Sequence, residues 1–308
     1  MSEDARTPSR PRFPVKRVIA ALAVLALLAW VVRRAWDDAA GVDWQGLEIR
    51  PGLLAVAIIL PVCAFALQGV MWVVMMRGMG YRLGWLAGVR AYLLSLLGAY
   101  LPGKVLIMVI RAKVASEQGL PGLPVAGSVA LETLLRTVVG SALAAIGVWW
   151  LGVGEVYVVG LAVLIVGAAV VAHPRVFHAL AGFLLTRLGR DPLPQALSLS
   201  CLTTLLLGYL GFWVLYGAGF CVMVWAVLGE QVGAVAGLGV SFIASQISGN
   251  LAVFAPGGLG VSDATLAEAL RVTGSVGAAG VLAIIARVWR TACELLAVGL
   301  GYALGARR

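Results

Sequence analysis

A series of long apolar runs constrains this chain more than any other feature. Residues 53–76 and 196–228 contain no charged side chain, and about 20 apolar residues in a helix are enough to cross the hydrocarbon core of a bilayer. Hydrophobic residues make up 61% of the chain and charged residues only 12%, whereas about a quarter of a soluble domain is charged. We therefore predict an all-α polytopic membrane protein.

The apolar periodicity predicts 6–8 transmembrane helices and two helices broken at Pro-Gly pairs. The predicted spans are 18–35, 53–76, 84–101, 123–153, 156–172, 196–228, 232–254 and 275–305. Segments 104–118 and 259–272 are too short to cross comfortably, and each follows a Pro-Gly break. Segment 176–188 is amphipathic, and we expect it to lie on the membrane surface.

The first apolar stretch resembles a signal peptide because basic residues precede it. Arg33 and Arg34 follow it directly, and no small-x-small cleavage site closes it. We expect an uncleaved first span, preceded by a basic cytoplasmic tail at 1–17.

Several classes of function are disfavoured by what the sequence lacks. The net charge of +9 is dispersed at the ends of apolar runs, which is not the pattern of a nucleic-acid-binding face. The four cysteines lie inside apolar segments without metal-ligand spacing, and His173 and His178 are typical of interfacial residues. Common catalytic motifs are absent. We expect no enzyme activity, no cofactor and no metal site.

The distribution of Lys and Arg predicts the orientation, provided that 84–118 and 232–272 each enter the membrane and turn back. The segment ends on one side then carry 14 Lys plus Arg, and those on the other side carry four. Because the positive side of a membrane protein is cytoplasmic, both termini are expected inside, including 306–308. The first broken segment then enters from the cytoplasm and the second from outside.

This arrangement is an inverted-topology repeat. Pro102-Gly103 and Pro256-Gly257 are 154 residues apart, and Arg136-Thr137 matches Arg290-Thr291 at the same offset. Paired broken helices in two inverted halves are typical of transporters. We predict a single membrane domain over 18–305, with half repeats at about 18–153 and 156–305.

The two breaks are candidate binding sites because a helix that begins inside the membrane exposes free N–H groups. Lys104 begins the helix after the first break and Arg111 lies two turns on. Gly257, Gly258 and Gly260 form the second break, and Asp263 follows. The glycines suit close approach to a ligand, but they equally suit tight helix packing.

Charged residues in the middle of predicted spans are the remaining candidates: Glu132, Arg136, Arg287, Arg290 and Glu294. Each is costly at this depth unless it is paired or faces water. Glu132 and Arg136 are four residues apart and are expected to pair, as are Arg290 and Glu294, whereas Arg287 has no obvious local partner. These charges either line a cavity for a charged headgroup or form structural salt bridges between helices.

Two longer motifs resemble a known family. YLPGKVLIMVIRAKVASEQGLP is followed by ALETLLR, and APGGLGVSDATLAEAL is followed by ARVWR. These stretches resemble the lysylphosphatidylglycerol synthase transmembrane region, or flippase-like domain family, over about residues 15–305. The resemblance implies re-entrant helices and the movement of an aminoacylated phospholipid between leaflets. No aminoacyltransferase domain is expected here.

The family motif matches at Leu101, Pro102, Gly103, Arg111, Glu132 and Arg136, and again at Pro256, Gly257, Gly258, Leu259, Gly260 and Val261. It departs at Val105-Leu106, where the family often has Gly-Glu, and at Ser262-Asp263, where it often has Arg-Glu. The substrate can therefore differ from the aminoacylated lipid.

We expect a lipid translocase of a bacterial plasma (inner) membrane that binds an anionic or aminoacylated headgroup in a polar intramembrane cavity. Its ligand is a membrane phospholipid or another lipid-linked anion, and a homo-oligomer is compatible with this role. One alternative is a non-transporting partner of a lipid or glycan synthesis enzyme. Another is an ion-coupled carrier that uses Glu132 and Asp263 as proton sites.

Overall fold

The structure is a computed structural model of the 308-residue chain. It describes residues 29–30, 32–33, 36–37, 49–100, 105–152, 155–187, 194–229, 235–252, 255–274 and 279–305. The predicted tail 1–17, most of the predicted span 18–35, and residues 306–308 lie outside the described residues. So do Leu101, Pro102, Gly103 and Lys104 of the first predicted break.

The described residues form helices and contain no strand, which confirms the predicted all-α class. The α-helices are α2 (Pro51–Gly78), α3 (Trp85–Ser95), α4 (Val105–Ser116), α5 (Gly122–Leu151), α6 (Glu155–Ala172), α7 (Pro174–Arg187), α8 (Leu199–Leu228), α9 (Val235–Leu251), α10 (Val261–Val272) and α11 (Ala279–Ala303). Two short 3₁₀ helices, η1 (Leu96–Tyr100) and η4 (Pro256–Gly258), follow α3 and α9.

Three of these helices, α2, α5 and α8, are long and apolar enough to cross a bilayer, and α6 with α7 makes a fourth candidate if this pair, bent by 63°, is one span. A helix of 28 to 30 residues is about 42–45 Å long, which exceeds the hydrocarbon thickness. The predicted number of 6–8 also included α11, whose 25 residues contain three charges, and α9, which has only 17 residues.

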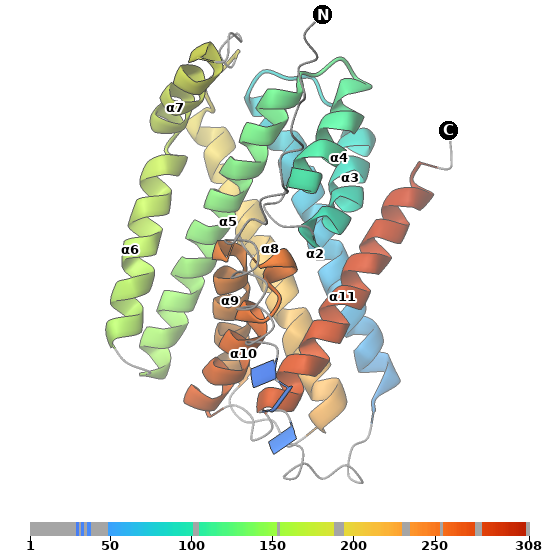
Figure 1. Cartoon of the computed structure of the whole chain (residues 1–308), viewed down its shortest axis with the longest axis vertical. Coiled ribbons are helices and arrows are strands. Elements are labelled where there is room, and N and C mark those ends of the chain that lie inside the picture. The colour runs from blue at the N-terminus through green and yellow to red at the C-terminus, as the bar shows by residue number, and fades with distance from the viewer. Residues whose placement is uncertain are drawn as a thin grey trace, which may run out of the picture.

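Helices α2 and α8 pack along each other (Figure 1). Glycines on α8 make this close packing possible. A Cβ atom on Gly208 would lie 2.0 Å from the sulfur of Met71, and one on Gly219 would lie 2.8 Å from the ring of Pro61. Larger residues at these two positions would therefore force the helices apart.

Buried aromatic rings join α8 to α9 and α11. The rings of Phe220 and Phe242 stack with centroids 4.5 Å apart, and Tyr216 meets Phe242 edge to face at 4.9 Å. Trp289 of α11 joins this cluster and donates a hydrogen bond from Nε1 to the carbonyl oxygen of Ala57, at 3.1 Å. These contacts fix the part of α11 that carries Arg290.

The second half of the bundle repeats the helix order of the first half. At an offset of 154 residues, α2, α3, α4 and α5 coincide closely with α8, α9, α10 and α11. The helix contacts repeat as well. Helix α5 packs on α9, and their counterparts in the other halves, α11 and α3, also pack on each other. In Figure 1, α2 and α11 run upward along the chain, whereas α8 and α5 run downward. Each counterpart therefore runs in the opposite direction.

Short helix pairs occupy the positions of the two predicted breaks. Helices α3 and α4 pack together in the upper part of Figure 1, and α9 and α10 pack together in the lower part. The 3₁₀ helices η1 and η4, which follow α3 and α9 along the chain, contact each other. The ends of both pairs thus meet at the seam between the halves.

Candidate functional site

A cavity of about 130 Å³ lies at this seam and is lined by residues from both halves. Five of the predicted charged residues line it, as do two glycines of the second break: Arg111, Glu132, Arg136, Arg290, Glu294, Gly257 and Gly258. Asp263 and Arg287 do not line it. The position of Lys104 lies outside the described residues.

Arg111 and Glu132 form a buried ion pair on one wall of the cavity. Arg111 Nη1 lies 2.5 Å from Glu132 Oε2, and Arg111 Nε donates to Ser95 Oγ at 3.0 Å. Tyr92 donates from its hydroxyl to the other carboxylate oxygen of Glu132 at 2.9 Å, and the guanidinium of Arg111 lies 4.2 Å from the centroid of the Tyr92 ring. Both carboxylate oxygens of Glu132 are therefore contacted from neighbouring helices, and the Tyr92 hydroxyl also contacts the side chain of Gln68.

The predicted pairing of Glu132 with Arg136 is wrong. The two residues share a face of α5, but Glu132 pairs with Arg111, 21 residues away on α4. Packing of α4 on α5 brings in a guanidinium that the i,i+4 rule cannot anticipate, because that rule considers only one helix.

Arg136 instead faces the cavity with a neutral partner. Its Nη2 donates to Asn250 Oδ1 of α9 at 3.1 Å, and its Nε has no hydrogen-bond partner. Among the residues that the structure describes, no carboxylate lies within 4 Å of this guanidinium. The backbone at this point is held by Trp213 of α8, whose Nε1 donates to the carbonyl oxygen of Arg136 at 2.9 Å.

Arg290, the counterpart of Arg136 on α11, has three partners. Its Nη1 donates to Gln246 Oε1 at 3.0 Å, and its Nη2 donates to the carbonyl oxygen of Gly257 at 2.7 Å. The predicted pair with Glu294 is confirmed, with Arg290 Nε 3.6 Å from Glu294 Oε1. The other oxygen of Glu294 accepts from the hydroxyl of Tyr100 in the first half at 2.5 Å.

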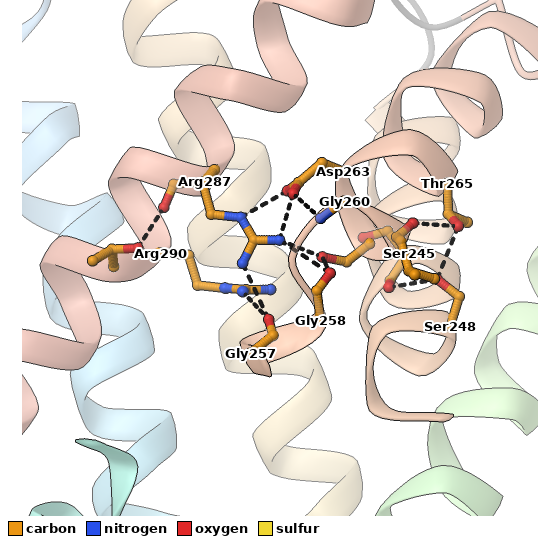
Figure 2. A network of polar contacts seen from close by, with 12 residues as sticks. Ser245, Ser248, Gly257, Gly258, Gly260, Asp263, Thr265, Arg287 and Arg290 are labelled. Atoms are coloured by element: carbon orange, nitrogen blue, oxygen red, sulfur yellow. Dashed lines mark hydrogen bonds and ion pairs between the residues drawn. The ribbon is translucent and has the colours of Figure 1, made fainter. Parts of the chain in front are cut away.

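Arg287 holds the second break together rather than lining the cavity (Figure 2). Its partner is Asp263, with Arg287 Nη2 2.6 Å from Asp263 Oδ2. The same guanidinium donates to the carbonyl oxygens of Gly257 and Gly258 at 3.1 and 3.3 Å. Sequence spacing did not reveal this pair, because the two residues lie on different helices, 24 positions apart.

The glycines of the second break are required by the backbone and by packing. Gly257, Gly258 and Gly260 have φ values of 58°, 68° and 78°, in the region that favours glycine. A Cβ atom on Gly258 would lie 2.8 Å from the Cα atom of Gly249 on α9. Asp263 Oδ2 accepts from the backbone N–H of Gly260 at 3.0 Å and so caps the first turn of α10.

Several polar residues line the cavity without having been predicted as site residues, among them Gln68, Tyr92, Gln246 and Asn250. A sequence signal existed for Gln68, which is the only strongly polar residue in the apolar run 53–76. Gln246 and Asn250 lie in the polar stretch before the second break, but nothing in the sequence indicates that they contact arginines. Within the described ranges, no group of three His, Cys, Asp or Glu side chains could hold a metal ion.

Comparison with known proteins identifies the family of this chain. A search of curated proteins finds no match. The family model described as the lysylphosphatidylglycerol synthase transmembrane region matches residues 18–299. That range includes both short helix pairs and every residue that lines the cavity. The chain is therefore a multi-pass membrane protein that belongs to the lysylphosphatidylglycerol synthase transmembrane-region family.

Proposed function

We propose that this protein is a lipid translocase, which binds an anionic or aminoacylated lipid headgroup in the cavity between its halves while the acyl tails stay in the bilayer. The observation that carries the proposal is Arg136, a cation inside a membrane domain that lines the cavity and, among the described residues, donates its one side-chain hydrogen bond to the amide of Asn250. An intramembrane charge is costly, and it is retained where it binds a substrate or an ion.

The charges on the cavity wall favour an anionic ligand. Of the residues that the structure describes, three arginines and two glutamates line it, which gives a formal charge of +1. Glu132 is paired with Arg111, and Glu294 lies beside Arg290. Arg136 is therefore the cavity cation that is available to bind a phosphate group. Guanidinium groups bind phosphate well through parallel hydrogen bonds.

The arrangement of the helices supports movement between leaflets. We infer that α3–α4 and α9–α10 are re-entrant helix pairs in two inverted halves, and that they enter the membrane from opposite sides. Binding sites at the interface of inverted repeats, next to broken helices, are typical of alternating-access transporters. In this proposal the protein lies in the plasma membrane with both termini in the cytoplasm, and it works without enzyme activity or a cofactor.

Leaflet exchange of fluorescent lipids in liposomes tests the proposal. The full-length protein should accelerate exchange, and Arg136→Ala should slow it about tenfold or more, since one charge-assisted hydrogen bond contributes about 1.5–3 kcal/mol. Lys113→Ala is the control, because it removes an exposed cation on α4 that does not line the cavity. An unchanged thermal unfolding midpoint would show that Arg136→Ala is folded.

The proposal is contradicted if the wild-type protein does not accelerate the exchange of any of the three lipid classes, anionic, zwitterionic or aminoacylated.

The alternative function, a non-transporting partner of a lipid or glycan synthesis enzyme, is favoured by the exposed apolar side chains of Leu180 and Phe183 on α7. In that case Arg136→Ala would remain functional in cells, whereas polar substitutions at these two positions would remove a co-purifying enzyme.

A further inference from the structure

Gln68 is a buried polar side chain inside a transmembrane helix. It is 1% exposed and lies on α2, one of the helices that are long and apolar enough to cross a bilayer. Burial of an amide away from water is costly unless its N–H and carbonyl groups find hydrogen-bond partners. A glutamine in this apolar helix therefore requires partners at both ends of its carboxamide.

Only one end of the Gln68 carboxamide has a partner among the described residues. Gln68 Oε1 contacts the hydroxyl of Tyr92 on α3, which also lies 2.9 Å from Glu132 Oε1. Tyr92 is itself buried, so this contact fixes the carbonyl end of the amide. Gln68 Nε2 has no hydrogen-bond partner. Two N–H groups are thus left without a partner on a residue that lines the cavity.

The cavity wall has an excess of hydrogen-bond donors. In the described part of the chain, three cavity-lining side chains have a buried polar atom without a hydrogen-bond partner, namely Gln68, Arg136 and Arg290. Each of these atoms is a nitrogen that donates. Arg290 Nε lies 3.6 Å from Glu294 Oε1, so a carboxylate is already beside it. Gln68 and Arg136 therefore provide the N–H groups that remain for a ligand.

We propose that Gln68 is a ligand-binding residue, which donates from Nε2 to an oxyanion that Arg136 binds at the same time. An ionised phosphate diester has several acceptor oxygens and no proton to donate, so it can satisfy both side chains together. The neutral amide adds a directed hydrogen bond to the attraction of the guanidinium. This inference rests on the proposed function and adds to it a second residue that contacts the phosphate.

Binding of a phosphate-bearing probe to matched variants tests the role of Gln68. Native mass spectrometry of the full-length protein measures the retention of phosphatidylglycerol. Gln68→Met keeps the length of the side chain but has no N–H group, so retention should weaken about tenfold, as for the loss of one charge-assisted hydrogen bond. Ser141→Ala is the control and should bind like the wild type, because Ser141 Oγ is also buried without a partner in a transmembrane helix but does not line the cavity.

A second variant tests the direction of the hydrogen bond. Gln68→Glu keeps the shape of the side chain but replaces the donor by an acceptor, so it should weaken retention at least as much as Gln68→Met. If the carboxamide turned its oxygen to a donor group of the ligand instead, Gln68→Glu would keep or strengthen retention. The thermal unfolding midpoint of Gln68→Met should stay at or above the wild-type value, since the substitution removes buried N–H groups without a partner.

Glycerol 3-phosphate, offered at the same concentration, distinguishes the two sources of a phosphate group. Retention of phosphatidylglycerol alone identifies a lipid headgroup as the ligand, whereas retention of glycerol 3-phosphate identifies a soluble phosphate. In either case Gln68→Met should weaken the retention of the probe that the wild-type protein binds.

Three results would overturn the inference: equal retention by the wild-type protein and Gln68→Met, undiminished retention by Gln68→Glu, or retention of neither probe by the wild-type protein. Failure of the proposed function gives a different result. If Gln68→Met weakens binding but the wild-type protein never exchanges lipids between leaflets, the translocase proposal fails and Gln68 remains a binding residue. If the wild-type protein and Gln68→Met bind and exchange lipids equally well, the inference fails and the translocase proposal stands.

Discussion

At the scale of single residues, the Arg111–Glu132 pair illustrates how a buried charge becomes structural. The exposed fraction of the side chain is 3% for Arg111 and 5% for Glu132, and each group has further polar contacts. Transfer of the two ions from water is costly, and their mutual attraction compensates only when the geometry is good and the remaining lone pairs are satisfied. Removal of either partner leaves the other charge buried alone.

Glu132→Ala should therefore destabilise the protein strongly. Breaking a buried ion pair costs about 3–5 kcal/mol, so the thermal unfolding midpoint in detergent should fall well below that of the wild type. Glu268→Ala is the matched control, because the exposed Glu268 pairs with a partly exposed Arg271 on the same helix, α10. Exposed pairs contribute about 1 kcal/mol or less, so this variant should unfold near the wild-type temperature.

Equal midpoints for the two alanine variants would show that Glu132 is not stabilised by burial in this pair. The double variant Arg111→Met, Glu132→Leu separates structure from transport, since an apolar replacement of both partners is often neutral for stability. If the pair is purely structural, this double variant should fold and still accelerate lipid exchange.

At the scale of elements, the turn between α9 and α10 depends on glycine for two separate reasons. Gly258 has a φ of 68°, and the Cα atom of Gly249 occupies the space that its Cβ would need. Gly119, in the loop between α4 and α5, has a similar φ of 74° but no atom within 4 Å of a Cβ position. A comparison of substitutions at these two glycines therefore separates the cost of backbone strain from the cost of close packing.

Gly258→Ala should cost more stability than Gly119→Ala. An alanine forced into the left-handed region costs of order 1 kcal/mol, and this is the whole effect expected at Gly119. At Gly258 the clash with α9 adds to it, and a shift of the turn would disturb the hydrogen bond from Arg287 to the carbonyl oxygen of Gly258. Unfolding midpoints of the two variants provide the measurement. Equal losses would mean that α9 and η4 can separate freely.

Most helices could be predicted from the sequence, whereas the side-chain pairs between different helices could not. The predicted spans 123–153 and 156–172 correspond to α5 and α6 within two residues, because apolar runs and turn residues are local signals. The pairing of Asp263 with Arg287 depends on how α10 packs on α11. No local pattern encodes that distance, and for the same reason Asn250 and Gln246 were not linked to arginines.

At the scale of the whole molecule, the cavity belongs to neither half alone. Arg136 of the first half is held by Asn250 of the second, and Glu294 of the second half accepts from Tyr100 of the first. These two contacts therefore cross the seam. Any movement of one half against the other must change these contacts, which is the behaviour expected of a site between inverted repeats.

The orientation in the membrane provides the last prediction. The loop between α4 and α5, with Glu117, and the start of α2, next to Ile49, lie at opposite ends of the bundle (Figure 1). The positive-inside rule places the first of these in the cytoplasm, since Lys and Arg concentrate at that end. Both side chains are exposed, so a cysteine at either position should react with a maleimide.

In a background with the four natural cysteines replaced by alanine, Ile49→Cys should react with a membrane-impermeant maleimide in intact bacterial cells. Glu117→Cys should react only after the membrane is permeabilised. The permeabilised sample is the control that both thiols are reactive. The reverse pattern would leave the two inverted halves intact but place the α3–α4 pair on the outer side, so a headgroup reaching Arg136 through that pair would come from the opposite leaflet.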